Sequence, residues 1–216
     1  MLHLGATLQF GYTFSKMMEA VEFLNSTDPR PYESIGSLDR PHRLTASGIW
    51  EIPVGRKRRF GTKLPAPAAF VLAGWQLNAV VVRQAGAPLG FGNSIFTGDI
   101  KNIPLPKDER DVDRWFNMDA GFNRDTRLQL ASNIRTFPLR FSGVRSDGQA
   151  SWDLSLLKNF SLGEKAAAQF RAEAYNAWNH TNFNAPNTAP TNSAFGRITG
   201  TAGDARNWQF ALKLTY

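Results

Sequence analysis

The sequence predicts an all-β fold, and three observations support this prediction. Six segments alternate apolar with polar residues, the connections between them are alternately short and long, and no apolar run reaches the roughly 18 residues of a transmembrane helix. Segments of this kind pair as antiparallel strands when the chain turns back after each one. We expect six strands in up-and-down order, near residues 3–15, 42–53, 70–86, 151–160, 166–178 and 206–216.

The final segment, residues 207–216, shows the alternation most clearly. Its apolar face carries Trp208, Phe210, Leu212, Leu214 and Tyr216, while polar or small residues occupy the other face. A tilted strand of about 9 to 11 residues crosses a bilayer, and an aromatic residue at each end suits the two interfaces. The same segment also fits a half-buried edge strand of a soluble sheet.

The earlier segments repeat this pattern, with two interruptions and one segment that a helix would also suit. Arg83 falls on the apolar side of its strand, which is tolerable only close to a membrane interface. Lys158 also interrupts an apolar face near a strand end, from which its side chain could extend to water. The alanines of residues 166–174 would suit a helix, but their period of two favours a strand.

The connections indicate what kind of sheet the strands form. Residues 161–165 and 53–69 make the shorter connections, whereas residues 16–42, 89–151 and 179–206 are long and rich in Gly, Pro, Asn and Thr. Short periplasmic turns and long extracellular loops are typical of outer-membrane barrels. We therefore expect residues 1–216 to form one transmembrane β-barrel segment, with its C-terminus in the periplasm. Single-chain barrels begin at about eight strands, so six predict only part of a barrel.

The composition narrows the possible partners without choosing among them. A formal charge of +7 and a pI near 10.0 are compatible with nucleic acid, anionic lipid or lipopolysaccharide. The absence of cysteine excludes a disulfide framework and a thiolate metal site. The basic run at residues 56–59 lies in a connection without stacking aromatics, which favours a solvated turn near phospholipid headgroups over a nucleic-acid site. The start of the sequence carries no secretory signal pattern.

Nothing in the sequence predicts catalysis. The three histidines, His3, His42 and His180, have no metal-ligand spacing, and no catalytic or nucleotide-binding motif occurs. We expect no enzyme activity, no cofactor, no metal and no nucleic-acid partner.

Several short motifs occur in an order that resembles a known family. Near the C-terminus they are residues 152–160 (WDLSLLKNF), 169–180 (QFRAEAYNAWNH), 182–187 (NFNAPN), 195–199 (FGRIT) and 209–216 (QFALKLTY). Upstream they are residues 39–43 (DRPHR), 74–77 (GWQL), 84–88 (QAGAP) and 115–117 (WFN). Together they resemble the C-terminal part of TonB-dependent outer-membrane receptors, most closely the Oar-like subgroup with an N-terminal carboxypeptidase-regulatory-like domain.

This resemblance implies a transport function for the whole receptor. Such receptors have a barrel of about 22 strands around a plug domain, and they import a bound substrate with energy passed on by TonB. The present sequence lacks the plug, the TonB-contacting segment and the regulatory-like domain, so we expect a receptor fragment that does not transport by itself. Its expected partners are outer-membrane lipid, lipopolysaccharide and the barrel-assembly machinery, with plug and TonB reached only through the missing N-terminal regions.

The same resemblance and the alternation assign roles to individual residues. The candidates for lining the lumen are Gln169, Arg171, Glu173, Tyr175, Gln209 and Lys213, although a barrel interior is polar in any case. The candidates for the membrane interfaces are Trp50, Trp75, Trp152, Trp178, Trp208 and Tyr216, which could also pack in a soluble sandwich core. The resemblance implies that Phe210, Leu212, Leu214 and Tyr216 form the signal read by the barrel-assembly machinery.

The alternative reading is a protein of a different class. A soluble all-β binding module, such as a sandwich presenting long loops to a carbohydrate or a protein, would show similar strands. Expression without detergent distinguishes the two readings. A soluble, cooperatively unfolding monomer would support the binding module, and aggregation rescued by detergent would support the barrel segment.

Overall fold

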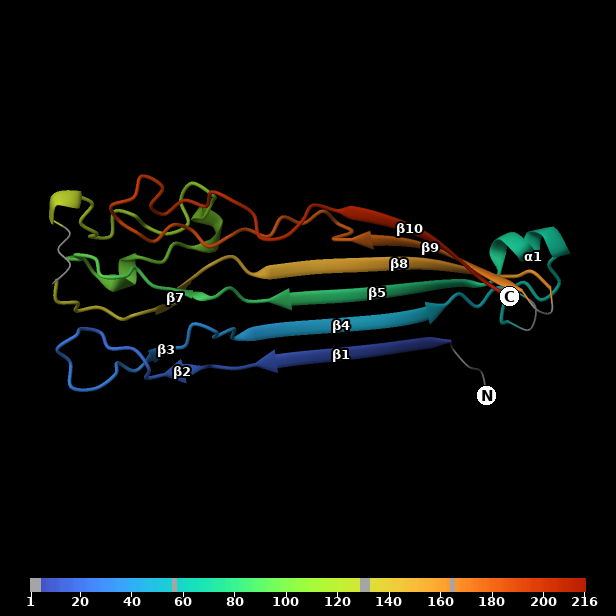
Figure 1. The fold of residues 1–216 in the computed structure, drawn as a ribbon, viewed down its shortest axis with the longest axis horizontal. Helices are drawn as coiled ribbons and strands as arrows, with labels where there is room; N and C mark the ends of the chain where they lie inside the picture. Colours follow the sequence, from blue (N-terminus) through green and yellow to red (C-terminus); the bar gives the residue numbers. More distant parts are fainter. Residues whose placement is uncertain (1–4, 56–57, 129–132, 164–165) are drawn as a thin grey trace.

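The computed structural model describes residues 5–55, 58–128, 133–163 and 166–216. Six long strands form one sheet: β1 (Ala6–Phe14), β4 (His42–Glu51), β5 (Trp75–Gln84), β8 (Gln149–Ser161), β9 (Ala167–Tyr175) and β10 (Asn207–Thr215). Each strand is antiparallel to its neighbours, and the order in the sheet is β1-β4-β5-β8-β9-β10 (Figure 1). The predicted all-β, antiparallel, up-and-down architecture is confirmed.

The register of the sheet keeps one set of side chains on one face from edge to edge. Phe10 of β1 is paired with Ala46, Ala46 with Val81, and Val81 with Trp152. Paired residues point to the same side of a sheet, so these apolar positions share a face. We call it the outer face, and we call the opposite, more polar face the inner face.

The connections separate cleanly between the two ends of the sheet. The three long loops lie at one end, which we call the loop end, and the connections containing residues 52–74 and 162–166 lie at the other, which we call the turn end (Figure 1). Two small antiparallel sheets lie within the loops. One pairs β2 (Met18–Glu19) with β3 (Ser34–Ile35), and the other pairs β6 (Pro88–Leu89) with β7 (Phe141–Arg145). The 3-10 helices η1 (Ile100–Asn102), η2 (Lys107–Glu109) and η3 (Thr126–Leu128) also belong to this end.

Two predicted strand boundaries are wrong. The strand expected at residues 70–86 begins only at Trp75, because Ala66–Leu72 form helix α1. Pro65 and Pro67 flank the first helical residue, where proline is well tolerated, and Gly74 adopts φ +78° before the strand starts. A side chain at position 74 would place its Cβ 2.6 Å from the Asn159 carbonyl oxygen.

The strand expected at residues 166–178 ends early for a similar local reason. β9 stops at Tyr175, and Asn176 takes the left-handed conformation with φ 48°. Its side-chain amide donates to the carbonyl oxygens of His180 and Asp204, and its side-chain oxygen accepts the His180 N–H. Trp178 therefore lies in a turn rather than in the strand.

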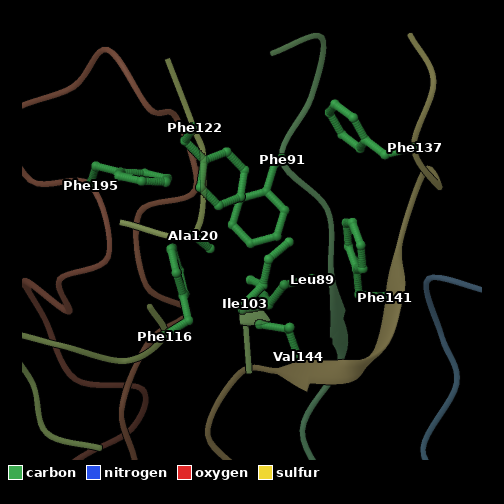
Figure 2. Close-up of a cluster of buried hydrophobic side chains, with 10 residues drawn as sticks. All are labelled: Leu89, Phe91, Ile103, Phe116, Ala120, Phe122, Phe137, Phe141, Val144 and Phe195. Atoms are coloured by element: carbon green, nitrogen blue, oxygen red, sulfur yellow. The ribbon is translucent and has the colours of Figure 1, made fainter. Parts of the chain in front are cut away.

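The main hydrophobic core lies in the loops rather than against the sheet. It consists of Leu89, Phe91, Ile103, Phe116, Ala120, Phe122, Phe137, Phe141, Val144 and Phe195 (Figure 2). Phe91 packs edge-on against Phe116 at 5.0 Å between ring centroids, and Phe122 does the same against Phe195 at 5.2 Å. We call this cluster the loop core. It joins the β5–β8 loop to the β9–β10 loop.

The sheet does not close on itself. β1 and β10 form its two edges, and each is paired on one side only in the part of the chain that the structure describes. All nine residues of β1 are exposed. No helix among the described residues is long and apolar enough to cross a membrane.

Candidate functional site

The outer face is a broad, uncovered apolar surface. Leu8 is 79% exposed, Phe10 68% and Leu212 66%, and even the central Leu77 and Leu156 are exposed. Leaving such side chains in water costs roughly 25 cal/mol for each Å² of apolar surface. An apolar face of this size fits contact with lipid. In a soluble protein, a second layer of structure would cover it.

Aromatic residues mark both ends of the outer face. Trp152 lies near the loop end of β8, and Phe160 lies on the same face near the turn end. The two are eight residues apart, or about 26 Å along a strand that rises about 3.3 Å per residue. With a strand tilt of about 40°, this corresponds to roughly 20 Å across a membrane, comparable with the apolar band of outer-membrane barrels.

The predicted interface aromatics fall into three groups. Trp152 and Trp208 lie on the outer face near the loop end, and Trp50 and Trp75 lie on it near the turn end. Trp178 is in the turn after β9 and is 68% exposed, whereas Tyr216 directly follows β10. The role of these residues at a membrane interface remains a prediction.

Helix α1 covers the turn end of the outer face. Its Phe70 packs on Phe160 at 5.2 Å between ring centroids, and the Trp75 indole N–H donates to the Val71 carbonyl oxygen at 2.9 Å. Lys158 is enclosed beneath the end of the helix, where its ammonium group donates to the Ala73 carbonyl oxygen and lies 5.3 Å from the Trp75 ring centroid. The prediction that Lys158 extends to water is wrong, since the helix supplies its partner.

The inner face brings all six predicted lumen candidates together. Gln209 is paired with Glu173, and Lys213 with Gln169, so these residues and Arg171 share this face. Tyr175 lies at its loop end and is paired with Asn207.

These inner-face polar groups are linked to one another across the strands. The Gln169 amide donates to the Asn159 side-chain oxygen at 2.9 Å, and the Ser155 hydroxyl donates to Glu173 at 3.3 Å. Arg171 lies 3.8 Å from the Glu173 carboxylate. Contact with a plug or a substrate stays a prediction, because the observed bonds lie within the wall itself.

The loops carry the polar residues that sequence reasoning missed. Asp39 is 1% exposed, and its carboxylate accepts the Met17 N–H and pairs with Arg145, each at 2.7 Å. Burial alone would raise the pKa of Asp39, but the Met17 amide and the guanidinium groups of Arg145 and Arg40 together hold it below its ordinary value. This cluster fastens the β1–β4 loop to β7.

A second cluster strengthens the same contact between loops. The Arg140 guanidinium group pairs with Glu19 at 2.8 Å and also with Glu22. Asn25 exchanges hydrogen bonds with the backbone of Arg135, accepting its N–H at 2.7 Å and donating to its carbonyl oxygen at 3.1 Å. The β1–β4 loop is therefore attached to the β5–β8 loop at several separate points.

Several motif residues also turn out to be structural. Phe116 and Phe195 belong to the loop core, and the Trp115 indole N–H donates to the Arg145 carbonyl oxygen at 2.7 Å. Asn182 accepts the Ala150 N–H at 2.7 Å and donates to the Ala150 carbonyl oxygen at 3.0 Å, as a neighbouring strand would. The motifs were visible in the sequence. Only the tertiary contacts show that these residues hold the loops together.

The described part of the chain contains no preformed metal site. No group of three or more His, Asp or Glu side chains there is arranged to hold a metal ion. Asp113, in the β5–β8 loop, pairs with Arg197 of the β9–β10 loop at 2.6 Å.

The sheet, its apolar outer face and its polar inner face define the wall of a membrane β-barrel. A family model described as "Outer membrane beta barrel domain" matches residues 2–209, nearly the whole chain, and the chain belongs to this family. Comparison with curated proteins and with solved structures gave no match. The membership confirms the predicted barrel class and identifies the chain as an outer-membrane protein.

Proposed function

We propose that this chain forms the C-terminal wall of the barrel in a TonB-dependent outer-membrane receptor of the Oar-like subgroup. The main observation in support is the open six-stranded sheet, which is apolar outside and polar inside and has every long loop at one end. The ordered motifs that resemble this subgroup support it, because they lie in the strands and in the folded loops. The C-terminus would be periplasmic, and the loops extracellular.

The open edges support a larger barrel. In lipid, each unpaired backbone group costs several kcal/mol, so β1 and β10 both require a neighbouring strand. We propose that other strands of the receptor supply these neighbours and complete the closed wall around a plug domain. The inner face would then line the lumen, and the receptor would reach TonB through its N-terminal regions.

The proposed contribution of this segment is structural and not catalytic. Two of its enclosed acidic groups are engaged by arginines, in the Asp39–Arg145 and Glu19–Arg140 pairs, which suits loop docking and not proton transfer. The barrel-assembly machinery would recognise β10 and Tyr216. Outer-membrane lipid would contact the outer face.

The soluble sandwich alternative does not describe this architecture. A sandwich would bury Leu8, Phe10 and Phe210 against a second sheet, whereas all three are exposed on a single layer. The family membership points in the same direction.

Isolation from the native outer membrane tests the proposal. The protein would be captured from detergent-solubilised outer membranes with an antibody against a β5–β8 loop peptide, and its particle analysed by peptide and native mass spectrometry. We expect peptides of this chain in one particle with those of a plug domain and of further barrel strands. Recovery of this chain in the outer membrane without any plug peptide would contradict the receptor assignment.

A further inference from the structure

A cleft of about 720 Å³ opens where the outer face meets the loops. The sheet contributes Tyr12 from β1, His42 from β4 and Arg83 from β5, and the β5–β8 loop contributes Lys107, Arg110 and Trp115. Arg83 shares the outer face with its paired neighbours Leu44 and Ala150. The cleft thus lies between the apolar outer face of the sheet and the folded β5–β8 loop.

The charged groups of the cleft are mostly cationic. Arg83, Lys107 and Arg110 form no ion pair with any carboxylate that the structure describes, and the Nε–H of Arg110 donates to the Leu105 carbonyl oxygen at 2.7 Å. The one carboxylate among the lining residues, Asp147, accepts the backbone N–H groups of Gly148 and Phe183.

Other acidic groups lie outside the lining. Asp108 and Glu109 follow Lys107 in η2 and are exposed. The cleft therefore presents a net positive charge that no carboxylate among its described lining residues neutralises by pairing.

The location of the cleft matches the depth of a lipid headgroup. The Tyr12 hydroxyl hydrogen-bonds His42 Nδ1 at 2.8 Å, and the Trp152 and His180 rings meet edge-on at 6.0 Å. Aromatic residues of this kind occupy the headgroup level at the ends of barrel strands. An arginine on the lipid-facing side of a barrel costs least at this level.

We propose that this cleft binds the phosphorylated headgroup of a glycolipid in the outer leaflet, that is, the phosphate groups of lipopolysaccharide. The inference rests on the orientation assumed in the proposed function, with the long loops outside the cell. Arg83 and Arg110 supply planar donor pairs that match phosphate oxygens, and Lys107 adds a mobile ammonium group. The acyl chains of the lipid lie along the outer face below Leu44 and Ala150.

The test compares two double variants with equal charge changes. R83Q/K107Q removes two cations from the cleft, whereas R59Q/K63Q removes one arginine and one lysine from the exposed connection at the turn end. The variants are introduced into the protein as it occurs in the outer membrane, and each is purified in detergent together with the barrel strands that accompany it. Each is then freed of lipid and titrated with purified lipopolysaccharide, and parallel titrations use dephosphorylated lipopolysaccharide. Far- and near-ultraviolet circular dichroism shows that the variants have folded.

We expect R83Q/K107Q to bind lipopolysaccharide about tenfold more weakly than the unmodified chain, and R59Q/K63Q to bind as the unmodified chain does. Dephosphorylated lipopolysaccharide should bind all three proteins equally weakly. Equal binding of lipopolysaccharide by both variants, or binding that does not depend on phosphate, would overturn the inference. If R83Q/K107Q fails to fold, the single variants R83Q and K107Q are titrated, and each must bind several-fold more weakly.

This result is independent of the receptor assignment. A particle with plug peptides but no phosphate-dependent binding would remove the lipid site and leave the receptor. Phosphate-dependent binding by a protein isolated without plug peptides would support the lipid site and contradict the receptor assignment.

Discussion

Asp39 links a sequence motif to the attachment of the long loops to one another. The buried carboxylate joins the end of the β1–β4 loop to Arg145 of β7, and its neighbours include Met17 at the start of the same loop. A single side chain thus connects three parts of the chain that are distant in sequence.

Acid should loosen this attachment. The pKa of Asp39 is lower in the folded than in the unfolded protein, so its ionised form stabilises the fold above the unfolded pKa. That stabilisation is lost as the pH falls through the folded pKa, which places the change below about pH 4. Protease digestion of the loops in detergent, followed between pH 7 and pH 3, should show faster cleavage only at the acid end. Cleavage that is independent of pH would contradict the role of Asp39.

Replacing Asp39 should have a similar effect at neutral pH. D39N keeps the shape of the side chain but removes the charge that faces Arg145, so we expect the loops to lose about 1–3 kcal/mol of stability. Hydrogen exchange of the loop amides would measure the change. D125N is the matched control, because the Asp125–Arg127 pair is at the surface and its loss should leave exchange unchanged.

The loops are the element that the sequence predicted least well. Glycine, proline and asparagine indicated long irregular connections, and the chain does form them. However, irregular backbone does not exclude a core, and Phe91, Phe116 and Phe195 come from segments too far apart to show any period. Side chains that meet only through tertiary contacts give no local pattern.

The strands were predictable for the opposite reason. Their alternation is visible within each segment. Because a slip of one residue would turn the apolar side chains to the other face, the apolar face determines the register of all six strands. The predicted boundaries were wrong where local turn chemistry overrides alternation, at helix α1 and at Asn176. The shared faces of Gln169, Arg171 and Glu173 followed from the same alternation, whereas the cleft around Arg83 depends on a loop that folds over it.

The loop core should behave as a unit separate from the sheet. Phe91 is 2% exposed and contacts Phe116, Phe122, Phe141 and Phe195, so F91A should destabilise the loops by about 3–5 kcal/mol. We expect rapid protease cleavage within residues 86–148, while the strands of the sheet keep their circular dichroism signal. F23A is the control, since Phe23 is 51% exposed. Loss of the sheet signal together with the loops would contradict their independence.

β10 should be the element that determines insertion. β10 is an edge strand of the described sheet with exposed apolar side chains, and we propose that an assembly factor recognises this strand and Tyr216. Y216D should lower the amount of protein in the outer membrane severalfold, measured by fractionation and immunoblotting, and Y216F should insert normally. Equal insertion of Y216D and the unmodified chain would remove the proposed signal.

At the scale of the whole molecule, the fold makes sense only with lipid on one side. The sheet buries little against other elements, and the main core lies in the loops beyond one end of its strands (Figures 1 and 2). A bilayer would cover the outer face from Trp152 to Phe160, and the aromatic ends and helix α1 would lie at its boundaries.

The most direct test is a spin-label scan along β9 in a reconstituted bilayer. The chain has no cysteine, so single cysteines can be placed in turn at residues 168–174. Labels at Ala168, Phe170, Ala172 and Ala174 should be accessible to oxygen in the lipid, and labels at Gln169, Arg171 and Glu173 to a water-soluble relaxation agent. A period of two in these accessibilities is the predicted result. Equal access of the water-soluble agent to both sets would contradict the barrel wall.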